Sequence, residues 1–388
     1  MQRCGLSLIV CVLLILLAQS SLSARTWYIK VDGTGDAPTI QAGTDSASHG
    51  DTILVGPGTY NWNNQGGNEY GMISILRGSA DMTIVSESGP GSTTLDGQFV
   101  GRIIFFQGET ELTVDGFTLT RGQATTTGAF TGGAFAAHFS SPVVKNCVFI
   151  NNNGNNGGAY WYGGFGTPQI TDCRFEANSA TTGGAIYLIN SPQNTVVSNC
   201  TIINNSATTQ AGAIFMYNFK VSIEQCTFAQ NTAPGRGGAI LIQNSPPTTV
   251  TNCTFYMNLG SPGAAISCFG ASAANVDKSI LALGLGGGAI DVDATSTMTF
   301  SCSDIWGNIG GDWVGAIAGQ LGTNGNFSAD PLFCAPVSNL YLNDVSPCAP
   351  GNHPDGDSCD IIGAHDVACG TVPVEQRTWG AIKSLYAE

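Results

Sequence analysis

The chain has 388 residues, of which 43% are hydrophobic, 52 are glycine and only 10% are charged. A chain this apolar and this poor in charge is not disordered. Thirteen Lys and Arg against 27 Asp and Glu give a net charge of −14. This charge argues against nucleic-acid binding, which needs a basic footprint, and against adhesion to anionic lipid.

Residues 1–24 have the pattern of a secretory signal peptide. Arg3 precedes the apolar run Leu8–Ala18, and the small residues Ser20, Ser21, Ser23 and Ala24 follow. The run is short for a bilayer span, and no later stretch reaches about 18 apolar residues. We therefore expect an exported, extracellular or cell-surface protein without a transmembrane segment in the mature chain. Association with an outer membrane stays open.

Residues 25–129 are expected to form an N-terminal cap followed by irregular coils. Thr39–Ala47 predicts a short amphipathic helix that covers the first coil. A strand at Asp51–Val55 and a turn at Gly56–Tyr60 follow it. Further short strands are predicted at 73–76, 82–85, 103–106 and 112–114.

Residues 130–325 contain two recurring motifs. Gly-Gly-Ala or a close variant begins at residues 132, 157, 183, 211, 237, 263 and 287. A Cys-x-Phe-x-x-Asn motif recurs at intervals of 26 or 27 residues, with its cysteines at Cys147, Cys173, Cys200, Cys226 and Cys253. A period of this length indicates a solenoid, a propeller or an array.

The local sequence selects the kind of repeat. Each repeat holds short β-rich runs broken by Gly, Asn and Ser-Pro, and no long helical periodicity is present. Three short strands in about 26 residues make one coil of a parallel β-helix. We predict an all-β, single-stranded right-handed parallel β-helix with an N-terminal capping helix, because parallel crossover connections are right-handed.

Stacked coils place equal positions above one another, which predicts ladders of like side chains. The first and third residues after each Gly-Gly-Ala motif are apolar and are expected to point into the core. The Cys and Phe ladders should also point inward. The asparagines should lie in a turn, with their side-chain amides bonded to one another along the stack.

The remaining residues divide into a closing segment at 326–370 and a tail at 371–388. Cys334, Cys348, Cys359 and Cys369 lie in the closing segment, where an exported protein forms disulfides. Four cysteines allow three connectivities, and the sequence does not choose among them. The ladder cysteines are expected to stay free, because stacked parallel side chains lie too far apart for a disulfide. The tail is either a docking signal or a helix packed on the last coil.

The repeats resemble a known family. Gly183–Ile186 and Gly237–Ile240, alternating with Phe175/Asn178 and Phe228/Asn231, look like the repeat of the polymorphic outer-membrane protein family, over about residues 130–310. The resemblance implies a β-helix displayed on the cell surface for adhesion. Members of that family end in an outer-membrane β-barrel, for which this chain has no room, so autotransport is not implied.

Both ends resemble other β-helix proteins. Thr39-Ile40-Gln41, Gly50–Ile53 and Gly58-Thr59-Tyr60 are similar to the opening of secreted β-helix proteins, including pectate-lyase-like enzymes. Asp330–Phe333, Ser346-Pro347-Cys348 and Asp360–Ala364 look like a common ending of bacterial right-handed β-helix proteins.

Charged residues in the repeats fall at different ladder positions, so stacking does not gather them. The acids of residues 121–300 are Asp172, Glu176, Glu224, Asp277, Asp291 and Asp293. We carry over no lyase or hydrolase residue set and interpret most of these charges as solvated. Asp291 and Asp293 share one strand face and are a candidate Ca²⁺ site, with Asp304 or Asp312 as further candidate ligands. The alternative is that they only solubilise the outer face. The four histidines show no metal-ligand spacing.

The outward positions of the first strand supply the leading candidate site. Trp161, Tyr187, Phe215 and Tyr217 are predicted to form an exposed aromatic stripe over three successive coils. Flat aromatic faces suit sugar rings, and Trp and Tyr also suit protein partners. The alternatives are that a neighbouring loop covers the stripe, or that the rings only stabilise the sheet.

These observations favour an exported, non-catalytic adhesion or recognition protein that binds a polysaccharide or a cell-surface protein through this stripe. No nucleic-acid partner is expected, and no cofactor other than the Ca²⁺ considered above. The alternative is a polysaccharide lyase or glycoside hydrolase of the pectate-lyase-like type. That alternative rests on the fold and on the N-terminal resemblance.

Overall fold

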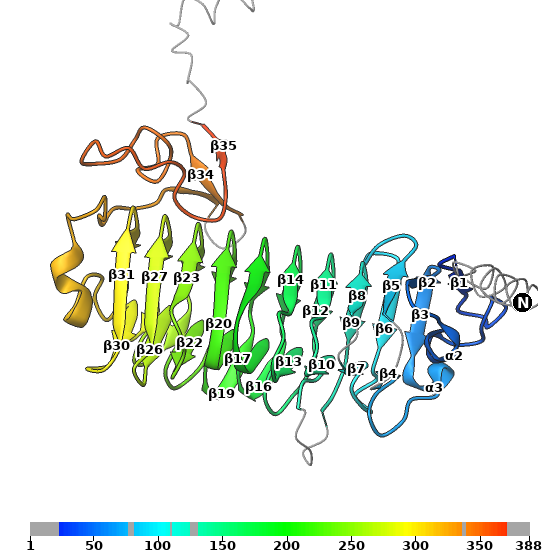
Figure 1. Ribbon diagram of the computed structural model, residues 1–388. Coiled ribbons are helices and arrows are strands. Elements are labelled where there is room, and N and C mark those ends of the chain that lie inside the picture. Colours follow the sequence, from blue (N-terminus) through cyan, green and yellow to red (C-terminus); the bar gives the residue numbers. More distant parts are fainter. Residues whose placement is uncertain (1–22, 77–80, 109–110, 125–130, 336–338, 371–388) are drawn as a thin grey trace, which may run out of the picture.

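Parallel strands stack along a single axis to form three faces of a right-handed solenoid (Figure 1). The computed structural model describes residues 23–76, 81–108, 111–124, 131–335 and 339–370. The predicted signal peptide lies almost entirely outside the described residues, and the predicted tail at 371–388 lies wholly outside them. The predicted β-helix architecture is confirmed.

In each coil, the strand of the first face comes directly after the Gly-Gly-Ala motif in the chain. The strand of the second face comes next. The first face consists of β4 (Ile73–Ile75), β7 (Ile104–Gln107), β10 (Phe135–His138), β13 (Tyr160–Gly163), the start of β17 (Ile186–Ser198), the start of β20 (Ile214–Glu224), β22 (Ile240–Gln243), β26 (Ile266–Phe269) and β30 (Ile290–Val292). The second face consists of β1 (Thr26–Ile29), β2 (Asp51–Val55), β5 (Met82–Ser86), β8 (Leu112–Asp115), β11 (Val143–Lys145), β14 (Gln169–Thr171), the ends of β17 and β20, β23 (Thr248–Thr251), β27 (Ala273–Asp277) and β31 (Thr297–Ser301).

The third face completes each coil. It consists of β3 (Gly58–Asn61), β6 (Thr93–Asp96), β9 (Thr118–Thr120), β12 (Val148–Ile150), β15 (Arg174–Glu176), β18 (Thr201–Ile203), β21 (Thr227–Ala229), β24 (Thr254–Tyr256), β28 (Ile280–Ala282) and β32 (Asp304–Trp306). Two short pairs extend the turns, β16 (Ser179–Thr182) with β19 (Ser206–Gln210), and β25 (Leu259–Gly260) with β29 (Leu285–Gly286).

Two local predictions differ from the structure. The predicted turn at 56–60 is already strand from Gly58 onward, because Gly58–Asn61 pairs in register with Thr93–Asp96 of the next coil. Three short strands are predicted for each coil, but Ile186–Ser198 is one continuous strand, β17, which pairs with β20 over almost its whole length. Here the first and second faces run into each other without a break.

The core confirms the predicted ladders. The first and third residues after each Gly-Gly-Ala motif pair in register with their counterparts in the next coil, as Phe135 does with Tyr160 and Tyr160 with Ile186. Almost all of these side chains are buried in one continuous core, which the phenylalanines of the third face also enter. Phe149 stacks on Phe175 with ring centroids 4.7 Å apart.

The asparagine ladder has the predicted geometry. Each amide Nδ2 donates to the Oδ1 of the next asparagine at 2.9–3.0 Å, along the buried series Asn152, Asn178, Asn205, Asn231 and Asn258. The same Oδ1 also accepts from the backbone N–H of the preceding asparagine in the ladder. These five coils are therefore linked, each to the next, through fully bonded side-chain amides.

The cysteine ladder is free and buried, as predicted. The thiols of Cys200 and Cys226 donate to carbonyl oxygens of their own and the preceding coil. Burial raises the pKa of each of these thiols well above its usual value. They act as small apolar groups rather than as reactive thiolates.

Helices and glutamine side chains close the two ends. The predicted capping helix is confirmed as α2 (Ile40–Ser46), whose N-cap Thr39 accepts a bond from Ala42 N–H, and α3 (Trp62–Gln65) follows later in the cap. The Gln41 amide bonds both the N–H and the C=O of Ser74. At the other end, after η1 (Gly315–Gln320), the Gln320 amide bonds Phe300 N–H and Met298 C=O. Both glutamine side chains therefore form hydrogen bonds with backbone N–H and C=O groups of the end strands, which would otherwise be unpaired at the open edge of the sheet.

Residues 327–335 and 339–370 fold back across the outer face of the last coils and are called the back-folded segment (Figure 1). The segment contains the small sheet β33 (Phe333–Ala335), β34 (Asn339–Asn343) and β35 (Val367–Cys369). It packs on Tyr256, Ile280 and Ala282 of the third face as a second apolar cluster, separate from the solenoid core.

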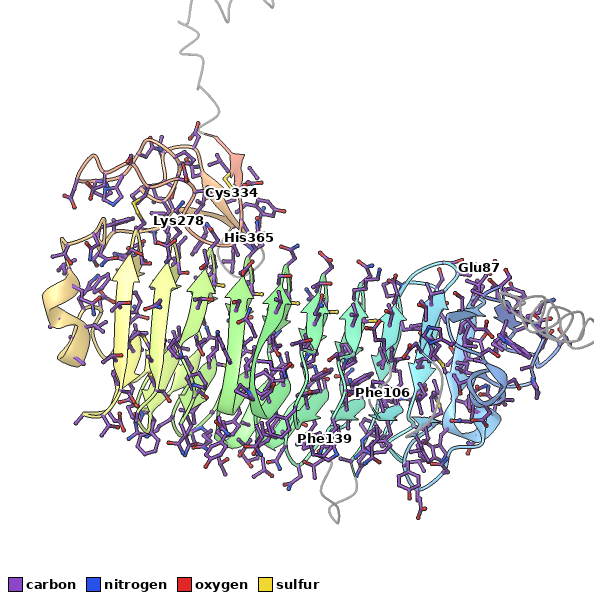
Figure 2. The ribbon with its side chains drawn as sticks, in the orientation of Figure 1. Glu87, Phe106, Phe139, Lys278, Cys334 and His365 are labelled. Atoms are coloured by element: carbon purple, nitrogen blue, oxygen red, sulfur yellow. A yellow bond between two sulfur atoms is a disulfide. The ribbon has the colours of Figure 1, made fainter. Side chains whose placement is uncertain are left out.

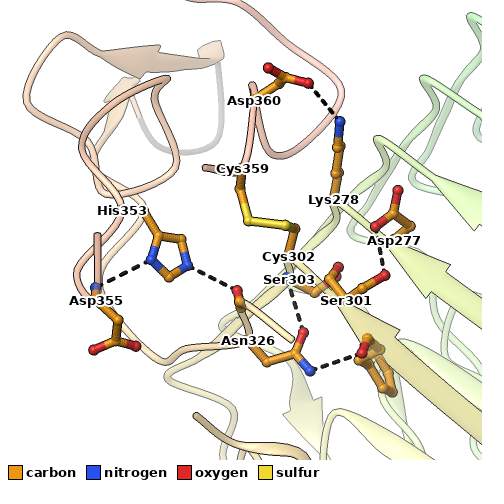
Figure 3. The surroundings of a disulfide bond; sticks show 12 residues. Asp277, Lys278, Ser301, Cys302, Ser303, Asn326, His353, Asp355, Cys359 and Asp360 are labelled. Atoms are coloured by element: carbon orange, nitrogen blue, oxygen red, sulfur yellow. Dashed lines mark hydrogen bonds and ion pairs between the residues drawn. A yellow bond between two sulfur atoms is a disulfide. The ribbon is translucent and has the colours of Figure 1, made fainter. Parts of the chain in front are cut away.

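The disulfides differ from the prediction. Cys334 pairs with Cys369, but Cys359 pairs with Cys302 of the solenoid, and Cys348 stays free and buried. The fold-back brings Cys359 against the turn before β32, where the Lys278–Asp360 ion pair lies beside the bridge (Figure 3). Cys302 lies outside the closing segment in which the disulfides are predicted, so none of the three expected connectivities is correct.

Candidate ligand-binding site

The predicted aromatic stripe exists, but much of it is buried. Trp161, Tyr187 and Phe215 occupy equal positions in three successive coils, and the Tyr187 and Phe215 rings stack with centroids 4.7 Å apart. Only 6% of Trp161 and 4% of Phe215 are exposed, whereas Tyr187 and Tyr217 are half-buried. The prediction of an exposed stripe is therefore wrong for Trp161 and Phe215.

The strand spacing explains this burial. Coils stack at about 4.8 Å, close to the centroid separation of two stacked aromatic rings, so each ring covers the next. Phe215 lies between Tyr187 and Leu241, and Trp161 packs with Phe105 and Ala136. Burial raises the pKa of the Tyr187 hydroxyl above its usual value, so it stays protonated and uncharged. The stripe is thus an outer apolar layer with a few accessible edges.

The main accessible part is a hollow of about 430 Å³ beside Trp161, which we call the aromatic hollow. It exists because the fourth position after the motif is glycine in one coil. His138 and Ile189 occupy that position in the flanking coils, whereas Gly163 has no side chain there and the Trp161 ring fills part of the space. The Trp161 ring lies over Gly163 so closely that a Cβ there would clash with it.

Aromatic rings and amides form the walls of the aromatic hollow. Phe139 is 38% exposed and Phe165 is 64% exposed, and their rings stack with centroids 6.4 Å apart. Phe139 is labelled at the lower edge of the solenoid in Figure 2. Asn190 and Asn218 line the opposite side, with Asn218 Nδ2 donating to Asn190 Oδ1 at 3.4 Å. The floor is apolar, and polar groups stand at one rim.

Sequence reasoning missed Phe139, Phe165, Asn190 and Asn218. Three of them share one signal, because the fifth position after the motif reads Phe139, Gly164, Asn190 and Asn218, and all four have a positive φ. This is where the first-face strand ends and the chain turns outward. The glycine at position 163 was visible in the sequence, but the volume of the hollow depends on the orientation of the Trp161 ring.

The structure does not support a Ca²⁺ site at Asp291 and Asp293. Asp291 forms an ion pair with Arg236, and Asp293 accepts bonds from Gly270 N–H and from Thr295. Asp304 is fully buried on the third face, where it bonds Cys348. Within the described residues, no group of three or more His, Cys, Asp or Glu is placed to hold a metal ion.

A family model described as "Right handed beta helix region" matches residues 99–212 and 197–327. These two matches together span more than half of the chain. The chain belongs to the right-handed β-helix family. The match supports a β-helix repeat protein in general and does not extend to the polymorphic outer-membrane protein family.

Solved structures give more distant likenesses for this β-helix protein. A rhamnogalacturonan lyase is 15% identical, with 92% of this chain and 99% of that chain covered and a TM-score of 0.46. A pectin methylesterase from carrot is 13% identical, with 85% and 93% covered and a TM-score of 0.35. We transfer no activity or residue role from either. A search of curated proteins gives no match. Within the part of the chain that the structure describes, no helix is long and apolar enough to cross a membrane.

Proposed function

We propose that this β-helix protein is exported and binds a polysaccharide in the aromatic hollow. The observation that carries the proposal is the hollow beside Trp161 and Gly163, walled by Phe139 and Phe165 and bordered by the amides of Asn190 and Asn218. A sugar ring has apolar C–H faces and polar edges, so an aromatic wall with amides at one rim complements both.

The lining favours binding over catalysis at this place. Among the described residues that line the hollow, none is acidic, and His138 is the one titratable side chain. Glycoside hydrolysis uses a pair of carboxylates, and elimination needs a base near the acidic proton and a group that neutralises the sugar carboxylate. The hollow therefore has the groups to hold an uncharged sugar but lacks a hydrolytic pair.

Two disulfides support the proposed export. Cys302–Cys359 and Cys334–Cys369 fasten the back-folded segment, and disulfides of this structural kind persist in oxidising compartments outside the cytosol. The signal-peptide pattern in residues 1–24 points to the same destination.

The proposal is tested with residues 25–370 on a glycan array, followed by calorimetric titration of the best soluble oligosaccharide. Phe165→Ala removes an exposed wall with little expected cost in stability. We expect it to weaken binding about tenfold, because ring stacking contributes about 1 kcal/mol beyond the area it buries. Asn190→Gly keeps the positive backbone φ and removes the amide, and should weaken binding by a smaller factor.

The matched control is Phe99→Ala, which removes a half-exposed aromatic ring outside the hollow. Loss of affinity in Phe165→Ala with no change in Phe99→Ala supports the site. Binding that survives both Phe165→Ala and Asn190→Gly contradicts it. Release of sugar fragments by the wild-type protein would favour the polysaccharide lyase or hydrolase alternative instead.

A further inference from the structure

A second cavity lies on another side of the solenoid, where the back-folded segment ends its path across the third face. There the segment contacts two neighbouring coils. In the first, Asn252 Nδ2 donates to Ile361 O at 2.8 Å, and Thr254 Oγ1 accepts from Ala364 N–H at 2.9 Å. In the second, the last of these contacts joins Thr227 Oγ1 and His365 Nε2 at 2.7 Å. His365 is labelled in Figure 2 beneath this segment, on the opposite edge from Phe139.

Beyond His365 the outer surface of β15, β18 and β21 is uncovered and forms a cleft of about 490 Å³, which we call the Arg174 cleft. One wall is the third face, with Arg174, Thr201 and Gln230. The other wall is Asn339–Tyr341 of β34, and the His365 ring lies between the two walls. The volume lies within the usual range for a small-molecule site, about 300–1,000 Å³.

The cleft holds hydrogen-bonding groups that the protein itself does not use. Arg174 donates through Nε to Glu176 at 2.8 Å, and within the described residues its Nη groups have no partner. The same holds there for Thr201 Oγ1, the Gln230 amide, Asn339 Nδ2 and the Tyr341 hydroxyl. Five unused donor groups from separate coils and from the back-folded segment therefore line one cavity.

The charge of the lining contrasts with that of the whole chain. The protein has a net charge of −14, yet the described residues that line this cleft include Arg174 and His365 and no Asp or Glu. Glu176 neutralises part of the guanidinium charge but uses only one of its five N–H donors. The free edge of the guanidinium fork matches the two oxygens of a carboxylate.

The rest of the lining suits a ring-shaped body. The Tyr341 ring is 41% exposed and is held in place by His365, with ring centroids 4.8 Å apart. A peptide strand cannot add here, because β15, β18 and β21 are each paired on both edges. Recognition in the cleft has to come from side chains.

We propose that the Arg174 cleft binds a small organic carboxylate, with its carboxylate on the Arg174 Nη groups and its ring against Tyr341. Gln230 and Asn339 bond the polar substituents of the ring. This site is separate from the aromatic hollow and holds its ligand by charge, whereas the hollow has no charged partner to offer.

The test titrates the intact protein with two carboxylates and their neutral counterparts: D-glucuronate against D-glucose, and benzoate against benzamide. The two pairs distinguish a sugar body from an aromatic one. We expect at least one carboxylate to bind while its neutral counterpart does not. Arg174→Gln should weaken that binding at least tenfold, since a hydrogen bond to a charged group contributes about 1.5–3 kcal/mol.

Two controls separate the cleft from general charge and from the other site. Lys145→Gln removes a positive charge of the neighbouring second face that is paired with Asp115, and Phe165→Ala alters the aromatic hollow. Both should leave carboxylate binding unchanged. If Arg174→Gln lowers the melting temperature, Tyr341→Ala replaces it as the decisive variant, with an expected weakening of about fivefold.

Three outcomes overturn the proposal. The first is that neither carboxylate binds, and the second is that Lys145→Gln weakens binding as much as Arg174→Gln. The third is that inorganic phosphate displaces the carboxylate at equal concentration, which would show a simple anion patch. None of these outcomes affects polysaccharide binding at the aromatic hollow, so the two proposals stand or fall separately.

Discussion

Asn205→Ala is expected to destabilise the protein by about 3–5 kcal/mol. Asn205 is the middle member of the asparagine ladder and is almost fully buried. Its Nδ2 donates to Asn231 Oδ1 and to two backbone carbonyls, and its Oδ1 accepts from the side chain and the backbone of Asn178. Alanine leaves these buried partners unpaired, and each costs about 1–3 kcal/mol when water cannot replace the lost bond.

The position of Asn205 adds a second effect. In a solenoid each coil contacts only its neighbours, so stability is close to a sum over coils and the interfaces between them. Weakening a central interface should let the two halves unfold separately. We expect the urea transition, followed by circular dichroism, to move to lower concentration and to become broader or biphasic.

The control is Asn204→Gly, which changes the adjacent, exposed asparagine while keeping its positive backbone φ of 57°. We expect only a small shift of the transition for this variant. Equal shifts for the two variants would mean that the ladder amides contribute little beyond turn geometry.

The repeating part of the fold was predictable because each coil has the same sequence motifs and packs against its neighbours in the same way. Cys-x-Phe-x-x-Asn and Gly-Gly-Ala recur at a constant interval, so one assignment of faces holds for all coils. Inward and outward positions, the free cysteines and the amide ladder all follow from strand alternation and stacking. Where the interval is less regular, as at Gly58–Asn61, the boundary between turn and strand was misplaced.

The candidate sites were less predictable because they depend on neighbours that do not repeat. Alternation places Trp161 and Phe215 outward, but alternation does not say how completely Tyr187 and Leu241 cover them. The Arg174 cleft and the pairing of Cys359 with Cys302 depend on the path of the back-folded segment. That segment has no repeat period, so no sequence pattern predicts how it aligns with the strands of the third face.

Asp304→Asn is expected to stabilise the protein at neutral and alkaline pH and to have little effect at pH 4. Asp304 lies at the start of β32 under the back-folded segment and is fully buried. Its Oδ1 accepts from Ala329 N–H at 3.0 Å, and its Oδ2 accepts from the Cys348 thiol at 3.5 Å. Burial raises the pKa of this carboxyl from 3.8 to about 8.

The raised pKa fixes the direction of the pH dependence. Below about pH 4 the carboxyl is protonated in both the folded and the unfolded state. Between pH 4 and 8 the unfolded chain releases the proton while the folded protein keeps it, so rising pH favours unfolding. The stability lost by pH 7 is on the order of 4 kcal/mol, and the loss levels off above about pH 8. Asparagine has nearly the same shape and does not titrate, so the variant lacks this loss.

The measurement is the melting temperature of wild type and variant from pH 4 to pH 9. We expect the two curves to meet near pH 4 and to separate by several degrees at pH 8, with the variant higher. Asp357→Asn, which changes an exposed acid of the same segment, should follow the wild-type curve. If the melting temperatures of wild type and Asp304→Asn instead change with pH in the same way, the prediction is wrong. That result would mean that Asp304 is ionised in the folded protein, with its negative charge stabilised by neighbouring groups. If only the Asp304→Asn curve departs from the wild-type curve, Asp304 is the group that makes the protein less stable at alkaline pH. Because Asp304 lies under the back-folded segment, its ionisation would loosen that segment, which also forms one wall of the Arg174 cleft.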